Sequence, residues 1–166
     1  RNVSRILPLL PGIAMLSGCN NAAQKSNGQN DQKPNIIYIF ADDLGIGDLS
    51  CYGATKVSTP NIDRLAGQGV QFTNAYATSA TSTPSRFGLL TGMYPWRQKN
   101  TGIAPGNSEL IIDTACVTMA DMLKDAGYAT GAVGKWHLGL GPKGGTDFNK
   151  QITPNAQSIG FDYEFI

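Results

Sequence analysis

An uninterrupted apolar run at residues 36–40, with the sequence Ile-Ile-Tyr-Ile-Phe, narrows the choice of fold more than any other part of the chain. β-Branched and aromatic residues favour extended backbone, and a run without polar alternation is typical of a parallel strand that is covered on both faces. Two carboxylates, Asp42 and Asp43, follow the run directly. Because open α/β sheets build their sites at the carboxyl ends of parallel strands, the run predicts an α/β fold and the position of a site.

The pattern of a predicted strand followed by polar side chains recurs further along the chain. Residues 70–76 alternate apolar and polar side chains like a strand, and a stretch of small residues then leads to Ser82. Residues 128–133 predict another strand, and Lys135 and His137 follow it. We therefore expect these polar residues to lie at strand ends, where a site belongs.

Two helices are predicted from their boundary residues. Residues 59–66 begin with a threonine and a proline and stop at one of two following glycines, which predicts a short helix. Thr118 with Asp121 forms a variant of the capping box, with aspartate in place of glutamate. The helix that it starts carries Met119 and Met122 on an apolar face and ends near Gly127, so we expect both methionines in the core.

A third helix is predicted over residues 82–91, whose sequence is Ser-Thr-Pro-Ser-Arg-Phe-Gly-Leu-Leu-Thr. Pro84 suits the first turn, Ser82 or Thr83 can cap the helix, and Gly92 can end it. Ser82 would then stand at the positive end of the helix dipole, where an anionic group is stabilised. The stretch alone fits a reactive centre and an ordinary capped helix equally well.

The charged residues at the predicted strand ends also allow two interpretations. Asp42 and Asp43 could bind a hard divalent cation, Ca²⁺ or Mg²⁺, or could form a solvated turn. Lys135 and His137 would project to the same side of an extended segment, with Trp136 on the other side, and could both reach one anion. A lone histidine is more often structural, and a lone lysine is usually solvated.

The first 33 residues differ in kind from the rest. Arg1 and Arg5 precede an apolar run that ends in Leu-Ser-Gly before Cys19, and this run is too short and broken to span a bilayer. It resembles a bacterial lipoprotein signal, so residues 1–19 predict a signal peptide with Cys19 as the lipidated residue, and a plain secretory signal is the alternative. Residues 20–33 are polar and predict a flexible linker to a folded domain at 34–166.

The composition argues against a nucleic-acid partner, and it leaves open whether the cysteines form a disulfide. The 13 basic and 12 acidic residues give a net charge of +1 without any basic run, so nucleic acid is not an expected partner. Cys51 and Cys116 could pair in an oxidising compartment, although the sequence does not show that they are near each other. Trp96, Arg97 and Lys99 lie in a predicted long loop and are either substrate contacts or surface residues.

Two stretches together resemble the signatures of the type I sulfatases. They are residues 82–92, with the pattern Ser-x-Pro-Ser-Arg and then Leu-Leu-Thr-Gly, and residues 127–139, with Gly-Lys-Trp-His-x-Gly at their end. Residues 42–45, 59–65 and 160–162 also resemble this family, so the resemblance covers nearly all of the predicted domain. It implies an α/β fold of the alkaline-phosphatase-like sandwich type, with a mostly parallel central sheet flanked by helices.

The resemblance implies that Ser82 is oxidised to formylglycine before it works. The serine form is typical of bacterial members with an anaerobic, radical-type maturase. Asp42, Asp43 and the formylglycine at Ser82 would be ligands of Ca²⁺ or Mg²⁺. Arg86 resembles the residue that holds the aldehyde hydrate of formylglycine.

Two further roles follow from the same resemblance. Lys135 is similar to the lysine that contacts the hydrate and a sulfate oxygen, and His137 to the histidine that helps to deprotonate the second hydroxyl. The family's remaining metal ligands, second histidine and smaller C-terminal domain have no counterpart in this sequence. We therefore expect an N-terminal fragment with an incomplete site.

The expected function is hydrolysis of sulfate esters, with a sulfated carbohydrate as substrate. The alternatives are a phosphate or phosphonate ester hydrolase of the same superfamily, or a glycan-binding lipoprotein without turnover. The signal predicts an exported protein in the periplasm or outer membrane of a Gram-negative bacterium, attached to the membrane only through its lipid.

Overall fold

The computed structural model describes residues 33–166, and the predicted signal, Cys19 and most of the predicted linker lie outside the described residues. The described residues belong to two units, 33–40 and 41–166, which are treated separately. The elements in chain order are η1 (Ile46–Asp48), η2 (Ser50–Tyr52), α1 (Pro60–Gln68), α2 (Ser82–Thr91), η3 (Pro95–Arg97), α3 (Met119–Asp125), β1 (Gly131–Val133), η4 (Ala156–Ile159) and β2 (Tyr163–Phe165).

The apolar run at 36–40 is not a strand, so this prediction was wrong for the described chain. Its side chains are exposed, and the rings of Tyr38 and Phe40 lie 6.4 Å apart in a tilted pair. A strand exists only where a neighbouring strand accepts its ladder of hydrogen bonds. In the described part of the chain, the sheet consists of β1 and β2 alone.

Helix α1 begins at Pro60, as predicted, and is tied to η2 by side-chain hydrogen bonds. Ser50 Oγ donates to Asp63 Oδ2 over 2.6 Å, and Thr59 Oγ1 donates to Asp63 Oδ1 over 3.0 Å. These bonds, the one from Ser50 first, lower the pKa of Asp63 below its ordinary value of 3.8. The first turn of α1 is therefore held by an ionised carboxylate, which is stabilising near a helix N-terminus.

The predicted strand at 70–76 is irregular in the structure. Instead of a strand ladder, side chains hold its start: Tyr52 Oη donates to the Phe72 carbonyl over 2.9 Å, and Gln71 Nε2 donates to the Cys51 carbonyl over 2.8 Å. The alternating apolar residues are exposed, Tyr76 by 89%. Alternation predicts a half-buried strand only where a neighbouring strand is present, and the described residues provide none here.

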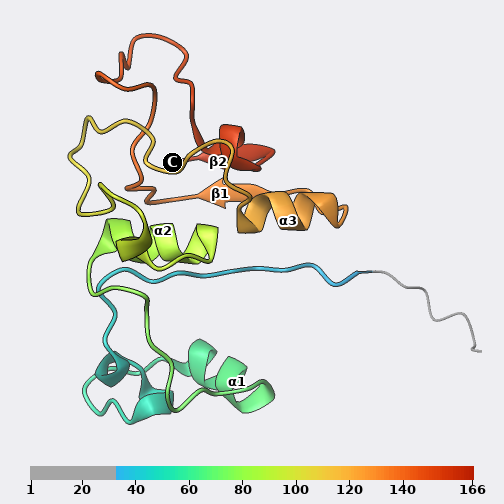
Figure 1. Cartoon of the computed structure of the whole chain (residues 1–166). Coiled ribbons are helices and arrows are strands. Elements are labelled where there is room, and N and C mark those ends of the chain that lie inside the picture. Colours follow the sequence, from blue (N-terminus) through green and yellow to red (C-terminus); the bar gives the residue numbers. More distant parts are fainter. Residues whose placement is uncertain (1–32) are drawn as a thin grey trace, which may run out of the picture. The chain divides into compact units, whose positions relative to one another are not determined.

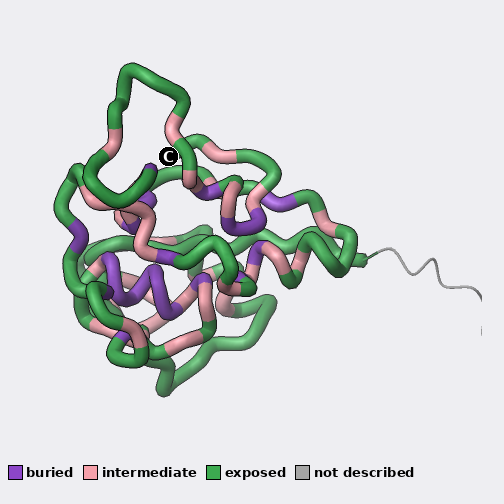
Figure 2. Tube along the Cα trace, turned by 45° about the horizontal axis from the view of Figure 1, so that its top comes forward, coloured by how far each residue is buried: buried purple, intermediate pink, exposed green. Residues whose placement is uncertain are grey.

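Helix α2 (Figure 1) has seven buried residues among its ten, and Figure 2 colours buried residues purple. It spans the predicted residues and ends at Gly92 in the left-handed conformation, with φ of 66°. The predicted capping was wrong, because the N-cap is Thr81, without a side-chain cap, and Ser82 is the first helical residue. Phe87 and Leu90 face the core from this helix.

Helix α3 and the parallel pair β1–β2 complete the core (Figure 1). The predicted capping box is confirmed, since Thr118 Oγ1 accepts from Asp121 N and the Asp121 carboxylate accepts from Thr118 N. Strand β1 is shorter than predicted, and it pairs with β2 from Gly131 opposite Tyr163 to Val133 opposite Phe165. The parallel pairing agrees with the predicted α/β class.

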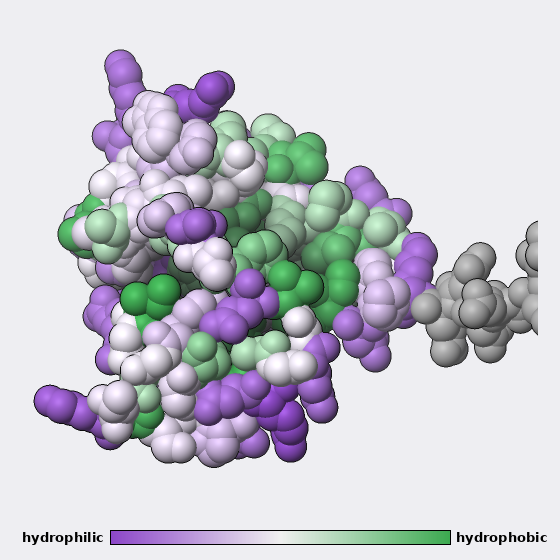
Figure 3. Space-filling view, turned by 90° about the horizontal axis from the view of Figure 1, so that it is seen from below, coloured by the Kyte–Doolittle hydropathy of each residue, from purple (hydrophilic) through white to green (hydrophobic). Residues whose placement is uncertain are grey.

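The core lies around α2 and the segment that follows β1. Its buried members are Phe87, Leu90, Ile112, Trp136, Leu138, Ala156 and Ile159. Met119 packs against this cluster as predicted, whereas Met122 is 57% exposed, so the expectation for Met122 was wrong. Figure 3 shows apolar side chains at the surface of one face of the molecule. Within residues 33–166, none of the helices is long and apolar enough to cross a bilayer.

Candidate functional site

The site is built around the N-terminal turn of α2, where Arg86 holds Ser82. Arg86 is 9% exposed, and its Nε donates to Ser82 Oγ over 2.9 Å. Its Nη1 donates to the Lys135 carbonyl over 2.9 Å, which fixes the guanidinium between α2 and the segment after β1. Because Arg86 follows Ser82 by four residues, the two side chains lie on one face of the helix. One planar cation therefore positions the hydroxyl and the backbone that carries Lys135.

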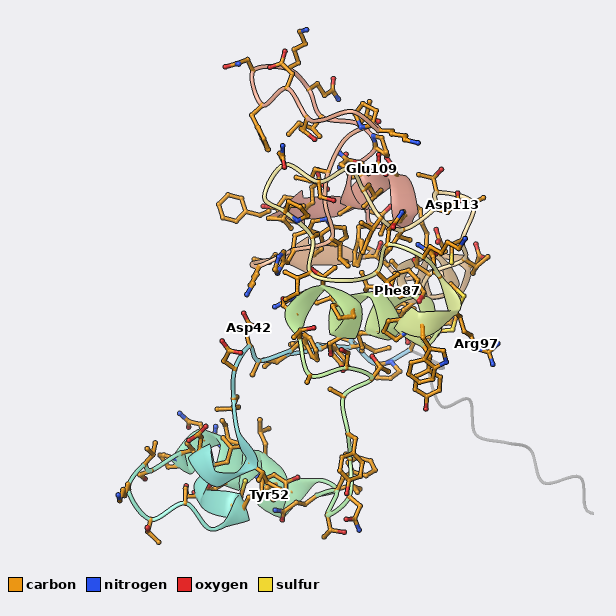
Figure 4. The ribbon with its side chains drawn as sticks, turned by 60° about the vertical axis from the view of Figure 1, so that its left-hand side comes forward. Asp42, Tyr52, Phe87, Arg97, Glu109 and Asp113 are labelled. Atoms are coloured by element: carbon orange, nitrogen blue, oxygen red, sulfur yellow. The ribbon has the colours of Figure 1, made fainter. Side chains whose placement is uncertain are left out.

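Asp42 closes the other side of this cluster. Its carboxylate accepts a hydrogen bond from Lys135 Nζ and lies 3.5 Å from Arg86 Nη2. The bond from Lys135, together with the positive charges of Lys135 and Arg86, lowers the pKa of Asp42 below its ordinary value of 3.8. Figure 4 shows Asp42 at one end of α2 and Arg97 toward the other. Ser82, Arg86, Lys135 and Asp42 thus form one connected group, here called the α2 cluster.

His137 lies next to the α2 cluster in an unexpected conformation. The sequence predicted an extended segment, but His137 has a left-handed backbone with φ of 51°. Its Nε2 lies 3.0 Å from the Ala104 carbonyl, which can only accept, so the geometry assigns the proton to Nε2. Its Nδ1 is buried and has no hydrogen-bond partner among the described residues. A neutral His137 therefore keeps an unused basic nitrogen.

Thr83 is a linking residue that the sequence interpretation considered only as a helix cap. Its side chain is fully buried, and Oγ1 donates to the His137 carbonyl over 2.9 Å while it accepts from Ala104 N over 3.1 Å. Thr83 thereby joins α2, the residue His137 and the 101–108 loop at one point. In the sequence, only the position of Thr83 directly after Ser82 could have indicated this role. Ala104 contributes only backbone atoms, so its side-chain type gave no indication.

The two aspartates supply the oxygen donors that a hard cation prefers, but not a complete site. Asp43 is exposed, has φ of 55°, and forms no ion pair with another described residue. The structure groups no three acidic, histidine or cysteine side chains that could hold a metal within residues 33–166. Ca²⁺ takes six to eight oxygen ligands, so Asp42 and Asp43 fit a part of such a coordination sphere.

The loop residues and cysteines that the sequence singled out are not part of the α2 cluster. Trp96 is 72% exposed and stacks on Tyr94, with ring centroids 4.1 Å apart. Arg97 and Lys99 are exposed in the same loop. Cys51 and Cys116 are both free thiols, so they do not form the disulfide that the sequence left open.

The arrangement of these residues defines a class of site. A serine hydroxyl in the first turn of a ten-residue helix accepts a hydrogen bond from Arg86, which also holds the backbone of Lys135, and this arrangement favours a ligand with a tetrahedral anionic group. The lysine follows the C-terminal end of a strand in a parallel sheet, which is where α/β folds place their sites. The class is an α/β protein with a serine hydroxyl, two basic side chains and a carboxylate grouped at the end of a strand.

Comparison with known proteins narrows this class to one family. The family model described as Sulfatase matches residues 34–165. The chain belongs to the sulfatase family, and its fold is accordingly of the alkaline-phosphatase-like α/β type, as the sequence predicted.

Individual relatives agree with this assignment. The chain is 90% identical over 166 residues to an N-acetylgalactosamine-6-O-sulfatase of Bacteroides thetaiotaomicron, which covers 100% of this chain and 32% of the relative. It is 50% identical over 115 residues to human arylsulfatase A, covering 67% of this chain and 22% of the relative. The chain thus spans about a third or less of the curated relatives that it matches.

Solved structures give the same result. A Bacteroides thetaiotaomicron structure described under the metabolism of multiple glycosaminoglycans matches with a TM-score of 0.79 and 96% identity, over 81% of this chain and 28% of that chain. The structure of Ps i-CgsB in complex with k-i-k-neocarrahexaose matches with a TM-score of 0.69 and 38% identity, over the same shares of the two chains. Both likenesses extend across most of the described residues.

Proposed function

We propose that the full-length protein hydrolyses sulfate esters of sulfated glycans. The observation that carries the proposal is the α2 cluster, in which Arg86 holds Ser82 while Lys135 and Asp42 complete the group. Arg86 and Lys135 are positively charged, so they can offset the negative charge of a bound sulfate group. They can also offset the further negative charge that develops on its oxygens during nucleophilic attack. Membership of the sulfatase family supports this choice of anion.

The nucleophile in this proposal is formylglycine, made from Ser82 by an anaerobic-type maturase. Its hydrate supplies two hydroxyls on one carbon, of which one bonds to sulfur as the alcohol leaves and the other expels sulfate as the aldehyde re-forms. Arg86 Nε already donates to the oxygen on this side chain, and an oxygen of the hydrate accepts the same bond. Arg86 and Lys135 are proposed to hold the hydrate and the sulfate oxygens, as family members do.

His137 is proposed to take the proton from the second hydroxyl. The assignment of its ring proton to Nε2, which faces the Ala104 carbonyl, leaves Nδ1 as a proton acceptor. Thr83 supports this geometry by bonding the His137 backbone.

A divalent cation, Ca²⁺ rather than Mg²⁺, is proposed to bind Asp42 and Asp43 together with the formylglycine and further oxygen ligands. Bound there, the cation would polarise a sulfate oxygen. Ca²⁺ accommodates more oxygen ligands and less regular geometry than Mg²⁺, which suits an exposed pair of adjacent carboxylates. Lys135 lowers the pKa of Asp42 further below its ordinary value of 3.8, so the carboxylate is in the ionised state that a metal ligand needs.

The substrate proposed is a glycan that carries N-acetylgalactosamine 6-sulfate. The relative at 90% identity is named for this activity, and a 38% identical structure contains a carrageenan-type oligosaccharide by its name. Export as a periplasmic or outer-membrane lipoprotein, with lipid on Cys19 as the only membrane attachment, is part of the same proposal. It rests on the pattern of residues 1–19.

The test is an assay of the full-length protein after co-expression with an anaerobic-type maturase. The 6-sulfate and the 6-phosphate of N-acetylgalactosamine are compared side by side at equal concentration. We expect release of sulfate with kcat/KM at least about 100-fold above that for phosphate release. Preferential release of phosphate would support the phosphatase alternative, and tight binding without release of either would support a glycan-binding protein.

A further inference from the structure

A pocket of about 490 Å³ lies in the loop region beside the α2 cluster, and no role is yet assigned to it. It is lined by residues of the 100–111 segment and by Gly144 and Gly145, and is here called the loop pocket. Its volume is in the range of pockets that hold small ligands, and one pyranose ring fits within it. All of its lining residues belong to the unit formed by residues 41–166.

One wall of the loop pocket contacts the site directly through Ala104. The Ala104 carbonyl lies 3.0 Å from His137 Nε2, and its N–H donates to Thr83 Oγ1, the residue after Ser82. Ala104 is 8% exposed, so these bonds are largely shielded from water. Ala104 is thus shared between the lining of the loop pocket and the hydrogen bonds of His137 and Thr83.

Another part of the lining, within residues 108–111, is hydrogen-bonded to the segment that carries His137. Leu140 N donates to the Ser108 carbonyl over 2.9 Å, and Ile111 N donates to the Leu138 carbonyl over 3.0 Å. Between these bonds the two backbones are so close that a Cβ on Gly139 would lie 1.8 Å from the Glu109 carbonyl oxygen. The backbone of Glu109 is thus packed against Gly139, which follows His137 by two residues.

The polar groups of the loop pocket differ from those of the α2 cluster. Glu109 is its only charged lining residue, is half-buried, and its carboxylate forms no hydrogen bond or ion pair with another described residue. Figure 4 labels Glu109 in this loop region. Asn100 and Asn107 add exposed amides, and Ile103 adds apolar surface. Carboxylate and amide groups bind hydroxyl and N–H donors, while a carboxylate repels a sulfate.

We infer that the loop pocket binds the uncharged part of the sugar that carries the sulfate ester, with Glu109 accepting a hydrogen bond from a ring hydroxyl or the N-acetyl N–H. The sulfate then faces Arg86 and Lys135, and the neutral groups face Glu109. This separation of charge orients the ring in one direction and makes Glu109 a specificity-determining residue. The inference rests on the proposed function, which supplies the sulfated amino sugar as ligand.

The first test compares two substrates with the full-length, maturase-treated protein. One is N-acetylgalactosamine 6-sulfate, and the other is an aryl sulfate, which lacks ring hydroxyls and the N-acetyl group. Glu109→Ala is expected to lower the ratio of kcat/KM for the sugar to that for the aryl sulfate by about 10- to 100-fold, mainly through KM. Glu109→Gln, which keeps a neutral acceptor, is expected to lower it less. An unchanged ratio in Glu109→Ala would overturn the inference.

A matched control and a binding measurement complete the design. Asp125→Asn removes an exposed carboxylate at the end of α3, outside the pocket, and is expected to keep the ratio of the wild type. In a Ser82→Ala background, calorimetry with N-acetylgalactosamine 6-sulfate is expected to show a Kd at least tenfold higher for Glu109→Ala. If the wild type turns over neither substrate, the proposed function fails, and the loop pocket is then judged by this Kd alone. Equal Kd values, or no binding by the parent, would overturn the inference.

Discussion

Arg86 Nε donates a hydrogen bond to Ser82 Oγ over 2.9 Å across one turn of α2, while the same guanidinium reaches the Lys135 carbonyl and the Asp42 carboxylate. Lysine has a single ammonium group and cannot serve three acceptors in the fixed plane of a guanidinium. Arg86→Lys is therefore expected to lower kcat/KM for sulfate ester by at least about 100-fold. Steady-state kinetics on the full-length protein check this.

Arg64→Lys is the control for that substitution. Arg64 is exposed on α1, so its replacement is expected to leave kcat/KM within about twofold of the wild type. If Arg86→Lys keeps full activity, the α2 cluster does not need the fork of Arg86, and its role as described is wrong.

A comparison of Thr83 with Thr78 tests whether the side-chain hydrogen bonds of Thr83 stabilise the fold. Thr83 Oγ1 is buried and satisfies both the His137 carbonyl and Ala104 N, whereas Thr78 Oγ1 is buried and has no partner among the described residues. Valine has the same shape as threonine without the hydroxyl. Thr83→Val leaves two buried backbone groups unpaired and is expected to lower the free energy of unfolding by about 1–3 kcal/mol.

Thr78→Val removes a hydroxyl that makes no bond, so it is expected to be neutral or stabilising by up to about 1 kcal/mol. Urea unfolding of both variants measures the difference. Equal losses in the two variants would show that the Thr83 bonds contribute nothing specific.

Gly88 allows the segment before α2 to pass close to the helix. A Cβ at Gly88 would lie 2.3 Å from Thr78 Oγ1 and 3.0 Å from Thr78 Cβ, whereas a Cβ at Gly67 in α1 meets nothing within 4 Å. Gly88→Ala is expected to destabilise the protein by about 1–3 kcal/mol through overpacking. Gly67→Ala is expected to stabilise it by about 0.5–1 kcal/mol through helix propensity.

The contact itself can be tested with a double variant. If Thr78 is the obstacle, Thr78→Ala should recover most of the stability lost in Gly88→Ala, as measured in a double-mutant cycle of unfolding free energies. Additive effects without recovery would place the strain elsewhere.

The carboxylate of Asp162 makes the stability of the sheet region depend on pH. Asp162 Oδ1 lies 2.6 Å from Lys124 Nζ, and Oδ2 accepts from Thr130 N over 2.9 Å. These bonds, the one from Lys124 first, lower the pKa of Asp162 below its ordinary value of 3.8. A carboxylate with a lowered folded-state pKa stabilises the protein above its unfolded-state pKa and loses that effect as the pH falls through the folded-state pKa.

The difference in unfolding free energy between the wild type and Asp162→Asn is therefore expected to be largest at neutral pH and to shrink as the pH falls below about 4. Urea unfolding at a series of pH values measures it, with Asp125→Asn as the matched variant on an exposed carboxylate. A difference that grows on acidification would have the wrong sign for a lowered pKa.

Local signals predicted the helices well, because their determinants lie within the helices themselves. Pro60 marks the start of α1, Gly92 ends α2 with a positive φ, and Thr118 with Asp121 caps α3. The strands predicted at 36–40 and 70–76 are absent from the structure. A strand depends on a neighbour elsewhere in the sequence, and the described residues do not provide one.

The residues of the site were predictable by type and family pattern, but their connections were not. Lys135 meets Asp42 across 93 positions of sequence, which no local pattern encodes. His137 was placed by an assumed extended backbone, whereas its left-handed conformation turns the ring toward Ala104. Contacts to backbone carbonyls carry no side-chain signal, so the part of the site made by the 101–108 loop becomes visible only in three dimensions.

Mass spectrometry of the peptide that contains Ser82 tests the central claim most directly. The full-length protein is purified after co-expression with an anaerobic-type maturase, its sulfatase activity is measured, and the proteolytic peptide spanning the start of α2 is weighed. We expect a peptide two hydrogen atoms lighter than the serine form, in a fraction that rises in proportion to specific activity, because formylglycine differs from serine by the loss of two hydrogens. A fully active preparation in which Ser82 is unmodified would contradict it.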